Sequence, residues 1–269
     1  MTPMLKGQEE VETGSATSPA RGSLAAAGRV WGGVGSKLAV PFLLHALVAL
    51  GALLLLNWMI ALYVPLSIHR IEQSYLIFFY HFPAAQSCFV MFTIVMVCSI
   101  AVLRTDGVAW DRRARVAGEV GLVACSVVLA TGSTWASAAW NTWWVWEDPR
   151  LMSAAVMWLT YAGYVLLQSQ MEDPAKRRRF AAVFGILAYL NIPLVILSIR
   201  LAGEVTSHPM AFDDFTSDER IVLTRWYGVL AFLLFYLLIF RWKLAREAVR
   251  ERLEGCLSEV RRLEERVVT

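Results

Sequence analysis

The sequence predicts an all-α protein whose six helices cross a membrane, with both termini on the cytoplasmic side. Of its 269 residues, 57% are hydrophobic and only 17% are charged, whereas soluble domains have roughly 45–50% apolar and about 25% charged residues. The hydrophobic residues gather in runs of about 20, the length that a helix needs to cross the hydrocarbon core of a bilayer. The basic residues between these runs favour alternate loops, which predicts the orientation.

The expected elements follow in chain order. The polar segment 1–37 has no apolar run, which predicts a disordered cytoplasmic tail. The first hydrophobic run is too long for the core of a signal peptide and ends without a small-residue cleavage site, so we expect it to stay as an anchor. The predicted spans are residues 38–64, 76–103, 116–135, 151–168, 180–201 and 221–240. A membrane domain of residues 38–243 would thus be followed by a cytoplasmic helix over 244–269.

The distribution of lysine and arginine predicts which loops face the cytoplasm. Of the 25 basic residues, 20 lie in the N-terminal tail, in the 104–115 and 170–179 loops and after residue 240. The other loops carry few basic residues, and the loop over 203–220 is acidic. By the positive-inside rule, the basic segments are cytoplasmic and the remaining loops lie outside.

Several function classes are excluded at this stage. Cys88, Cys98 and Cys125 fall in predicted spans and Cys256 follows the last one, with no CxxC spacing, so we expect packing residues rather than a zinc or thiol redox site. No glycine-rich phosphate loop, HExxH or GxSxG motif occurs, and no catalytic residues are predicted. The net charge of +3 is too small to indicate a nucleic-acid partner.

Tryptophan is concentrated in one predicted outer segment, residues 135–150. Five of the 11 tryptophans lie within 12 residues: Trp135, Trp140, Trp143, Trp144 and Trp146. An interfacial aromatic belt is one interpretation, but a belt would spread over all the helix ends. The cluster instead favours a platform for a flat, mostly apolar ligand with a polar edge, such as a porphyrin. If residues 140–146 form a shallow surface helix, Trp140, Trp143 and Trp144 share one face.

Two of the four histidines are expected near this platform. His81 lies close to the outer end of the second predicted span, where polar groups are costly and often functional. His208 lies in the outer loop before the sixth span. Imidazole is a usual axial ligand of haem iron, and one histidine from each side would complete a six-coordinate site. Each is also compatible with an ordinary interfacial or loop role, which is the preferred interpretation for His45 and His69.

These segments resemble a known family. The runs TGSTW (131–135) and WNTWWVWEDPRL (140–151) resemble the tryptophan-rich WWD signature of haem-handling membrane proteins. Six spans, a single such segment between the third and fourth spans, YHFPAA (80–85) at the start of the second span and His208 resemble the cytochrome c maturation protein C (CcmC) branch. The resemblance covers about residues 38–243.

The resemblance implies that haem b is held on the periplasmic face of the bacterial inner membrane and passed to a CcmE-like haem chaperone. It implies His81 and His208 as axial ligands, and Asp148 and Arg150 as the acidic and basic members of the tryptophan platform. Further implied partners are CcmA- and CcmB-like subunits of an ABC transporter, a small CcmD-like single-span protein and membrane lipid. The protein would hold and orient the cofactor without catalytic residues of its own.

The sequence departs from the family pattern at three places. Asn141 stands where the family usually has glycine, and Glu147 and Asp148 are alternative candidates for the motif acid. Leu76 replaces the basic residue that is common five positions before the histidine of the second span. Cationic partners for the haem propionates therefore stay open among Arg70, Arg150, Arg200 and Arg225.

Other interpretations are a transporter of haem or a small molecule and a quinone-type redox subunit. A transporter would place polar groups near the midplane on broken helices, and only Asn191 with Pro193 hints at such a break. A redox subunit would need paired histidines within spans. Beyond the last span, apolar residues recur at spacings of four and three from Val249 to Val267, which predicts either a surface amphipathic helix or a docking helix.

Overall fold

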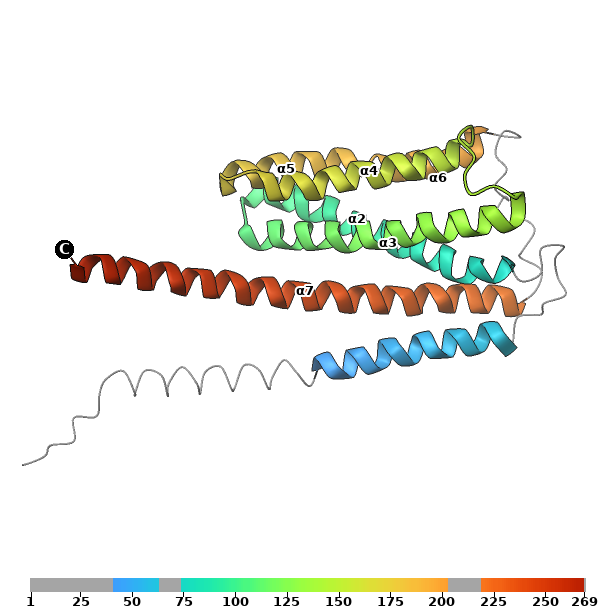
Figure 1. The fold of residues 1–269 in the computed structure, drawn as a ribbon, viewed down its shortest axis with the longest axis horizontal. Helices are drawn as coiled ribbons and strands as arrows, with labels where there is room; N and C mark the ends of the chain where they lie inside the picture. The colour runs from blue at the N-terminus through green and yellow to red at the C-terminus, as the bar shows by residue number, and fades with distance from the viewer. Residues whose placement is uncertain (1–40, 63–73, 203–218, 269) are drawn as a thin grey trace, which may run out of the picture. The chain divides into compact units, whose positions relative to one another are not determined.

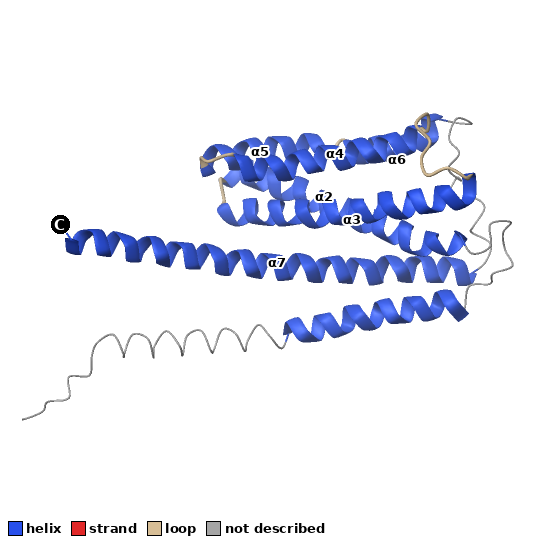
Figure 2. Cartoon of the chain, viewed as in Figure 1, coloured by secondary structure: helices blue, strands red, loops and turns tan. Residues whose placement is uncertain are grey.

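The computed structural model describes residues 41–62, 74–202 and 219–268, all of them in helices or short connections (Figures 1 and 2). Two units are distinguished, residues 1–44 and 45–269, and the contacts given below lie within the second. A helix over Pro41–Leu62 is followed by the 3-10 helix η2 (Ser74–Ile77) and by α2 (Phe78–Thr105), α3 (Val108–Trp140), α4 (Pro149–Gln170), α5 (Pro174–Ala188), α6 (Asn191–Ala202) and α7 (Glu219–Val268). The described part of the chain contains no strand.

The all-α prediction with six spans is confirmed. Six helical segments are long and apolar enough to cross a membrane: Pro41–Leu62, Phe78–Thr105, Val108–Trp140, Pro149–Gln170, Pro174–Ser198 and Glu219–Arg266. The helices extend further than the hydrophobic runs because helix continues into polar sequence, as at the start of α3 and along α7. The side of the membrane on which the termini lie stays a prediction.

The fifth span consists of two helices. Helix α5 ends at Ala188, residues 189–190 form a turn, and α6 starts at Asn191. The groups at the turn find partners inside the span, because Asn191 Nδ2 donates to the Ala188 carbonyl at 2.9 Å and Leu190 N to the Leu187 carbonyl at 3.1 Å. Pro193 lies in the first turn of α6, where a missing N–H is tolerated. The break that Asn191 and Pro193 hint at is therefore present.

Helix α3 packs closely against α2 and α4 because it presents glycine to aromatic side chains of both helices. A Cβ at Gly121 would lie 2.5 Å from Phe92 Cε1, and one at Gly118 would lie 2.6 Å from Tyr164 Cε1. Phe92 itself is fully buried and stacked on Tyr161. Cys88 and Cys125 are buried in this same core as free thiols, which confirms their expected packing role.

We expect Gly121→Ala to destabilise the bundle, because the stacked Phe92 ring cannot move away from the added methyl group. Overpacking of this kind costs about 1–3 kcal/mol, which exceeds the roughly 1 kcal/mol that alanine gains over glycine in helix propensity. The measurement is thermal unfolding in detergent, with Gly163→Ala as the control, since its nearest neighbour would be Phe184 Cζ at 3.8 Å. Equal melting temperatures for the two variants would refute this account of the α2–α3 contact.

One end of the bundle, which we call the arginine-rich end, consists of the 104–119 and 171–179 segments and the part of α7 after residue 240. Asp173 caps α5 by accepting hydrogen bonds from Ala175 N at 2.9 Å and Lys176 N at 3.3 Å. The hydrogen bond from Lys176 N, and to a smaller extent the one from Ala175 N, lowers the pKa of the Asp173 carboxyl below its usual value. Close by, Arg177 pairs with the buried Asp111 at 3.3 Å, and Arg178 pairs with Asp106.

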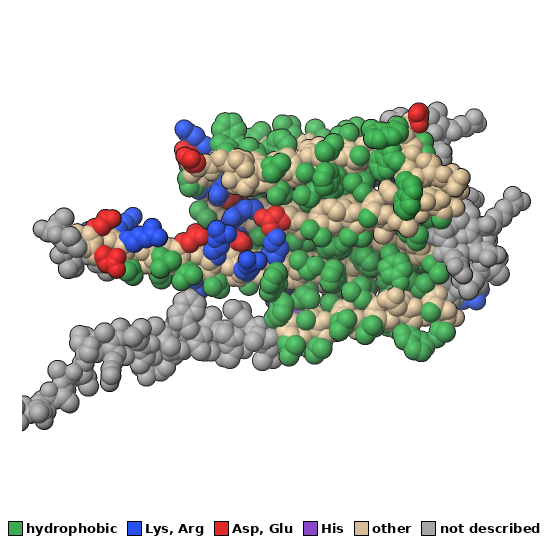
Figure 3. All heavy atoms as spheres, viewed as in Figure 1, with side chains coloured by type: hydrophobic (Ala, Val, Ile, Leu, Met, Phe, Trp, Pro, Cys, Tyr) green, Lys and Arg blue, Asp and Glu red, His purple; other side chains and the backbone are tan. Residues whose placement is uncertain are grey.

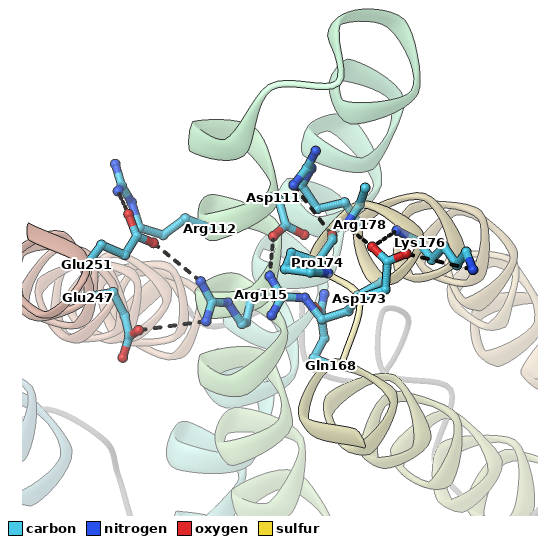
Figure 4. Close-up of polar contacts among 12 residues, drawn as sticks. Asp111, Arg112, Arg115, Gln168, Asp173, Pro174, Lys176, Arg178, Glu247 and Glu251 are labelled. Carbon is cyan, nitrogen blue, oxygen red and sulfur yellow. Dashed lines mark hydrogen bonds and ion pairs between the residues drawn. The ribbon is translucent and has the colours of Figure 1, made fainter. Parts of the chain in front are cut away.

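Helix α7 continues without interruption for 50 residues, and its extension beyond residue 243 is fixed to α3 by ion pairs. The pairs run antiparallel along the two helices. Glu119 pairs with Lys243, and Figure 4 shows Arg115 with Glu247, at 3.7 Å, and Arg112 with Glu251, at 2.5 Å. Charged side chains gather at this end in Figure 3, while hydrophobic ones cover most of the remaining face. The apolar residues of the predicted stripe that are described, from Val249 to Val260, are exposed.

Candidate functional site

The opposite end of the bundle, which we call the tryptophan end, collects most of the predicted site residues. His81 lies in the first turn of α2 and its ring rests against α3. Its Nδ1 lies 3.1 Å from Thr131 Oγ1, and a Cβ at Gly132 would lie 3.2 Å from its Cε1. Helix α4 also begins at this end, at Pro149, directly after the tryptophan segment.

The tryptophan segment is built differently from the predicted shallow helix. Helix α3 extends to Trp140, so Trp135 and Trp140 belong to its last turns, with ring centroids 5.0 Å apart in an edge-to-face arrangement. Residues 141–148 form an irregular loop, so the shallow helix over residues 140–146, which would have put Trp140, Trp143 and Trp144 on one face, is absent. The physical reason lies at Asn141.

Asn141 ends α3 in the left-handed backbone conformation, with φ of 56° and ψ of 29°. Glycine adopts this conformation without strain, and asparagine is the next most tolerant residue at a helix C-terminus. The replacement of the family's usual glycine by asparagine therefore keeps the turn. Beyond it, the Thr142 hydroxyl donates to the Trp144 carbonyl at 3.1 Å and holds the loop compact.

The loop displays some tryptophan rings and covers another. Trp143 and Trp146 are 64% and 72% exposed, which leaves their faces accessible. Trp144 is half-buried and makes an edge-to-face contact with Trp146, with ring centroids 6.3 Å apart. Its indole Nε1 is buried and has no hydrogen-bond partner within the described segments. A donor of this kind is costly to bury unless an acceptor comes to it.

Asp148 and Arg150 connect the loop to α4. Asp148 is fully buried and caps α4, because its carboxylate accepts from Arg150 N at 2.9 Å and from Leu151 N at 3.3 Å. Glu147 is exposed, so Asp148 is the acid with a structural role in the motif. The Arg150 side chain is half-buried, and its Nη1 has no hydrogen-bond partner among the residues that the structure describes.

We expect Asp148→Ala to destabilise α4 by about 1 kcal/mol, the usual effect of losing an N-cap side chain. Asp148→Asn should stay close to the wild type, because asparagine caps as well as aspartate. Thermal unfolding of the two variants separates the role of the cap from that of the charge. If both variants lost the same stability, the cap would not be the reason for burying Asp148.

A second arginine lies at this end. Arg225 of α7 is buried with its guanidinium carbon 5.6 Å from the centre of the Phe82 ring and 5.4 Å from that of Trp226. Arg150 and Arg225 are the two of the four suggested arginines whose side chains the structure describes, and both lie at the tryptophan end. His69, Arg70 and His208 lie outside the described residues, as does the side chain of Arg200. His45 lies elsewhere, with Nε2 2.9 Å from Arg241 Nη1.

Sequence reasoning missed Thr131 and Gly132 as contacts of His81, although both stand in the TGSTW run. Their role depends on which face of α3 meets α2, and no single-sequence pattern gives that register. No group of three or more histidine, cysteine, aspartate or glutamate side chains able to hold a bare metal ion occurs in the described ranges. A metal carried in a macrocycle needs only axial ligands from the protein, and the buried donors of Trp144 and Arg150 suit the carboxylates of such a ligand.

Comparisons with known proteins point to one family. The family model CcmC, heme exporter protein C, matches residues 34–253. The chain is 31% identical to heme exporter protein C of Escherichia coli (strain K12) over 133 residues, which is 48% of this chain and 52% of that protein. It is 30% identical over 123 residues to the protein of that name from Bradyrhizobium diazoefficiens (46% of each), and 33% identical over 122 residues to that of Paracoccus denitrificans (45% and 49%).

These alignments span about half the length of the curated relatives. The family model covers far more, from before the first span to the extension of α7. Together with six helices suited to cross a membrane, the comparisons confirm the resemblance read from the tryptophan segment. The chain is a multi-pass membrane protein that belongs to the heme exporter protein C family.

Proposed function

We propose that this protein binds haem b at its tryptophan end, on the periplasmic face of the bacterial inner membrane, and presents it to a CcmE-like chaperone for cytochrome c maturation. The observation that carries the proposal is the convergence of an imidazole, two buried donors and exposed indole rings at one end of the bundle. In this proposal His81 and His208 bind the iron. Haem supplies the metal and the redox chemistry, and the protein supplies position and environment.

The polar edge of the ligand would face arginine. Guanidinium binds carboxylates in a bidentate manner, and Arg150 Nη1 is a buried donor without a partner in the described part of the chain. Arg225 lies next to Phe82. We assign Arg150 to one haem carboxylate and keep Arg225 as the candidate for the second, in place of the basic residue that Leu76 replaces.

The ring of haem would lie against the tryptophans. Trp143 and Trp146 expose most of their surface. Covering such large aromatic rings with a flat apolar ligand removes apolar surface from water, which favours binding. Trp135 and Trp140 form a second aromatic pair at the end of α3, and Trp144 contributes its indole N–H. Asp148 would act indirectly by capping α4 and holding Arg150 in place.

Presentation is favoured over transport because the backbone groups at the break in the fifth span are already hydrogen-bonded. Transporters use broken helices to aim unpaired backbone groups and helix ends at a substrate near the midplane. Here Asn191 and Leu190 satisfy the carbonyls that precede the break. The orientation follows from the positive-inside rule, with the arginine-rich end in the cytoplasm, where CcmA- and CcmB-like subunits and a CcmD-like protein would complete the assembly.

The test is transfer of haem from the loaded, detergent-purified protein to a tagged, haem-free CcmE-like chaperone, followed by separation and visible absorption of both fractions. We expect haem to move to the chaperone fraction. Trp143→Ala should lower the initial haem occupancy without changing the shape of the spectrum. Trp242→Ala, which removes an exposed tryptophan at the arginine-rich end, is the matched control. Haem that stays with the wild-type protein would refute presentation.

A further inference from the structure

The turn of α3 over residues 128–132 forms the wall on which the His81 ring rests. Thr131 Oγ1 lies 3.1 Å from His81 Nδ1, and the ring also interacts with the main-chain carbonyl of Val128. Gly132 leaves room for the ring, because a Cβ there would come within 3.2 Å of Cε1. The imidazole therefore has a defined orientation in which Nδ1 faces α3.

The hydrogen of the Thr131 hydroxyl is already used within α3. Oγ1 lies 2.7 Å from the Val127 carbonyl oxygen and 3.2 Å from that of Val128. A carbonyl oxygen only accepts, so the hydroxyl donates to these atoms and offers a lone pair to His81. The Nδ1 that faces this lone pair must carry the proton of the neutral imidazole. The lone pair of the ring is then on Nε2.

We propose that Thr131 is a positioning residue that holds His81 in the tautomer with its proton on Nδ1, so that Nε2 is the atom that binds haem iron. This inference rests on the proposed function. The inference adds two details to that function, namely the atom of His81 that binds the iron and the residue that selects this atom. Metal-binding histidines commonly donate their second N–H to an acceptor, which fixes the ring and makes the ligand more basic.

The first test uses the haem-free full-length protein in detergent, labelled with ¹⁵N-histidine, at about pH 8, where an imidazole of ordinary pKa is neutral. The His81 signals are those lost in His81→Ala. We expect the wild type to show a protonated Nδ1 and an unprotonated Nε2. Thr131→Val keeps the shape of the side chain but removes the hydroxyl acceptor and leaves only the Val128 carbonyl, so the tautomer with its proton on Nε2 should become detectable. Thr131→Ser should restore the wild-type spectrum.

Thr134→Val is the matched control, because Thr134 lies on the same helix, is exposed and also donates to a main-chain carbonyl, that of Ala130 at 2.8 Å. It should leave the His81 signals unchanged. The two variants remove the same kind of hydroxyl from α3, and only Thr131 faces the histidine. A difference between them therefore reports the contact with His81 and not the stability of α3.

The second test uses the same variants loaded with haem. Loss of the acceptor makes His81 a less basic ligand, so Thr131→Val should raise the reduction potential of bound haem and weaken binding of ferric haem about ten-fold. Thr131→Ser and Thr134→Val should match the wild type. If the wild type binds haem but Thr131→Val changes neither the His81 tautomer nor the reduction potential of the bound haem, the inference is overturned and the proposed function stays intact. A wild type that binds no haem would overturn both.

Discussion

His81→Ala is expected to lower haem affinity more than about 100-fold, since changes to groups that merely support a metal ligand already reduce affinity 10–100-fold. His81 is the one described histidine at the tryptophan end, in contact with Thr131. Any haem that remains should lose the spectrum of a six-coordinate iron. The measurement is a haem titration of the purified variant followed by visible absorption, beside His208→Ala, for which we expect the same loss.

The control for this prediction is His45→Ala. His45 also lies in a predicted span but contacts Arg241, so its removal should leave haem affinity unchanged. Adding free imidazole to His81→Ala should partly restore the six-coordinate spectrum, because the cavity left by the side chain accepts the missing ligand. Wild-type affinity in His81→Ala would rule out this histidine as a ligand.

Arg177→Ala is expected to destabilise the protein by about 3 kcal/mol, because removing one partner of a buried ion pair leaves an uncompensated charge. Arg177 Nη2 lies 3.3 Å from Asp111 Oδ2, and the Asp111 side chain is only 4% exposed. The double variant Asp111→Asn/Arg177→Ala should recover part of this loss, since no buried carboxylate remains. Thermal unfolding in detergent measures both effects.

The control is Arg179→Ala. Arg179 is mostly exposed and lies 3.9 Å from Asp106, and exposed ion pairs contribute roughly 0–1 kcal/mol. Equal melting temperatures for Arg177→Ala and Arg179→Ala would show that the stability of the protein does not require Arg177 to compensate the buried carboxylate of Asp111.

The six spans could be predicted because lipid requires long apolar helices, and such runs stand out in any sequence. Helix ends could not be predicted from hydropathy alone. Helix α3 starts at Val108 and includes Asp111 and Arg112, whose charges are stabilised by partners distant in sequence. At its other end, α3 stops where Asn141 adopts a left-handed conformation. Asparagine permits this stop but does not dictate it, so the sequence left open a helix over residues 140–146 that the structure does not contain.

The candidate site could be predicted in composition but not in geometry. His81, Arg150 and the tryptophans were identified by residue type and by their place near span ends, and α2, α3 and α4 place them at the same end of the bundle (Figure 1). The contact with Thr131 depends on the register of α2 against α3. That register is set by packing, for example of Phe92 against Gly121, and many registers satisfy the same hydrophobic pattern. The sequence could not rank Arg225 among the four arginines suggested as partners of the haem propionates, because its position depends on how α7 packs against Phe82.

The most direct test of the central claim is the haem content and visible absorption spectrum of the wild-type protein, purified in detergent from haem-replete cells with its partners present. We predict a bound haem with the spectrum of a six-coordinate iron, retained through size-exclusion chromatography. A protein that stays colourless under these conditions, and also fails to take up added haem, would contradict the assignment of the tryptophan end as a haem site.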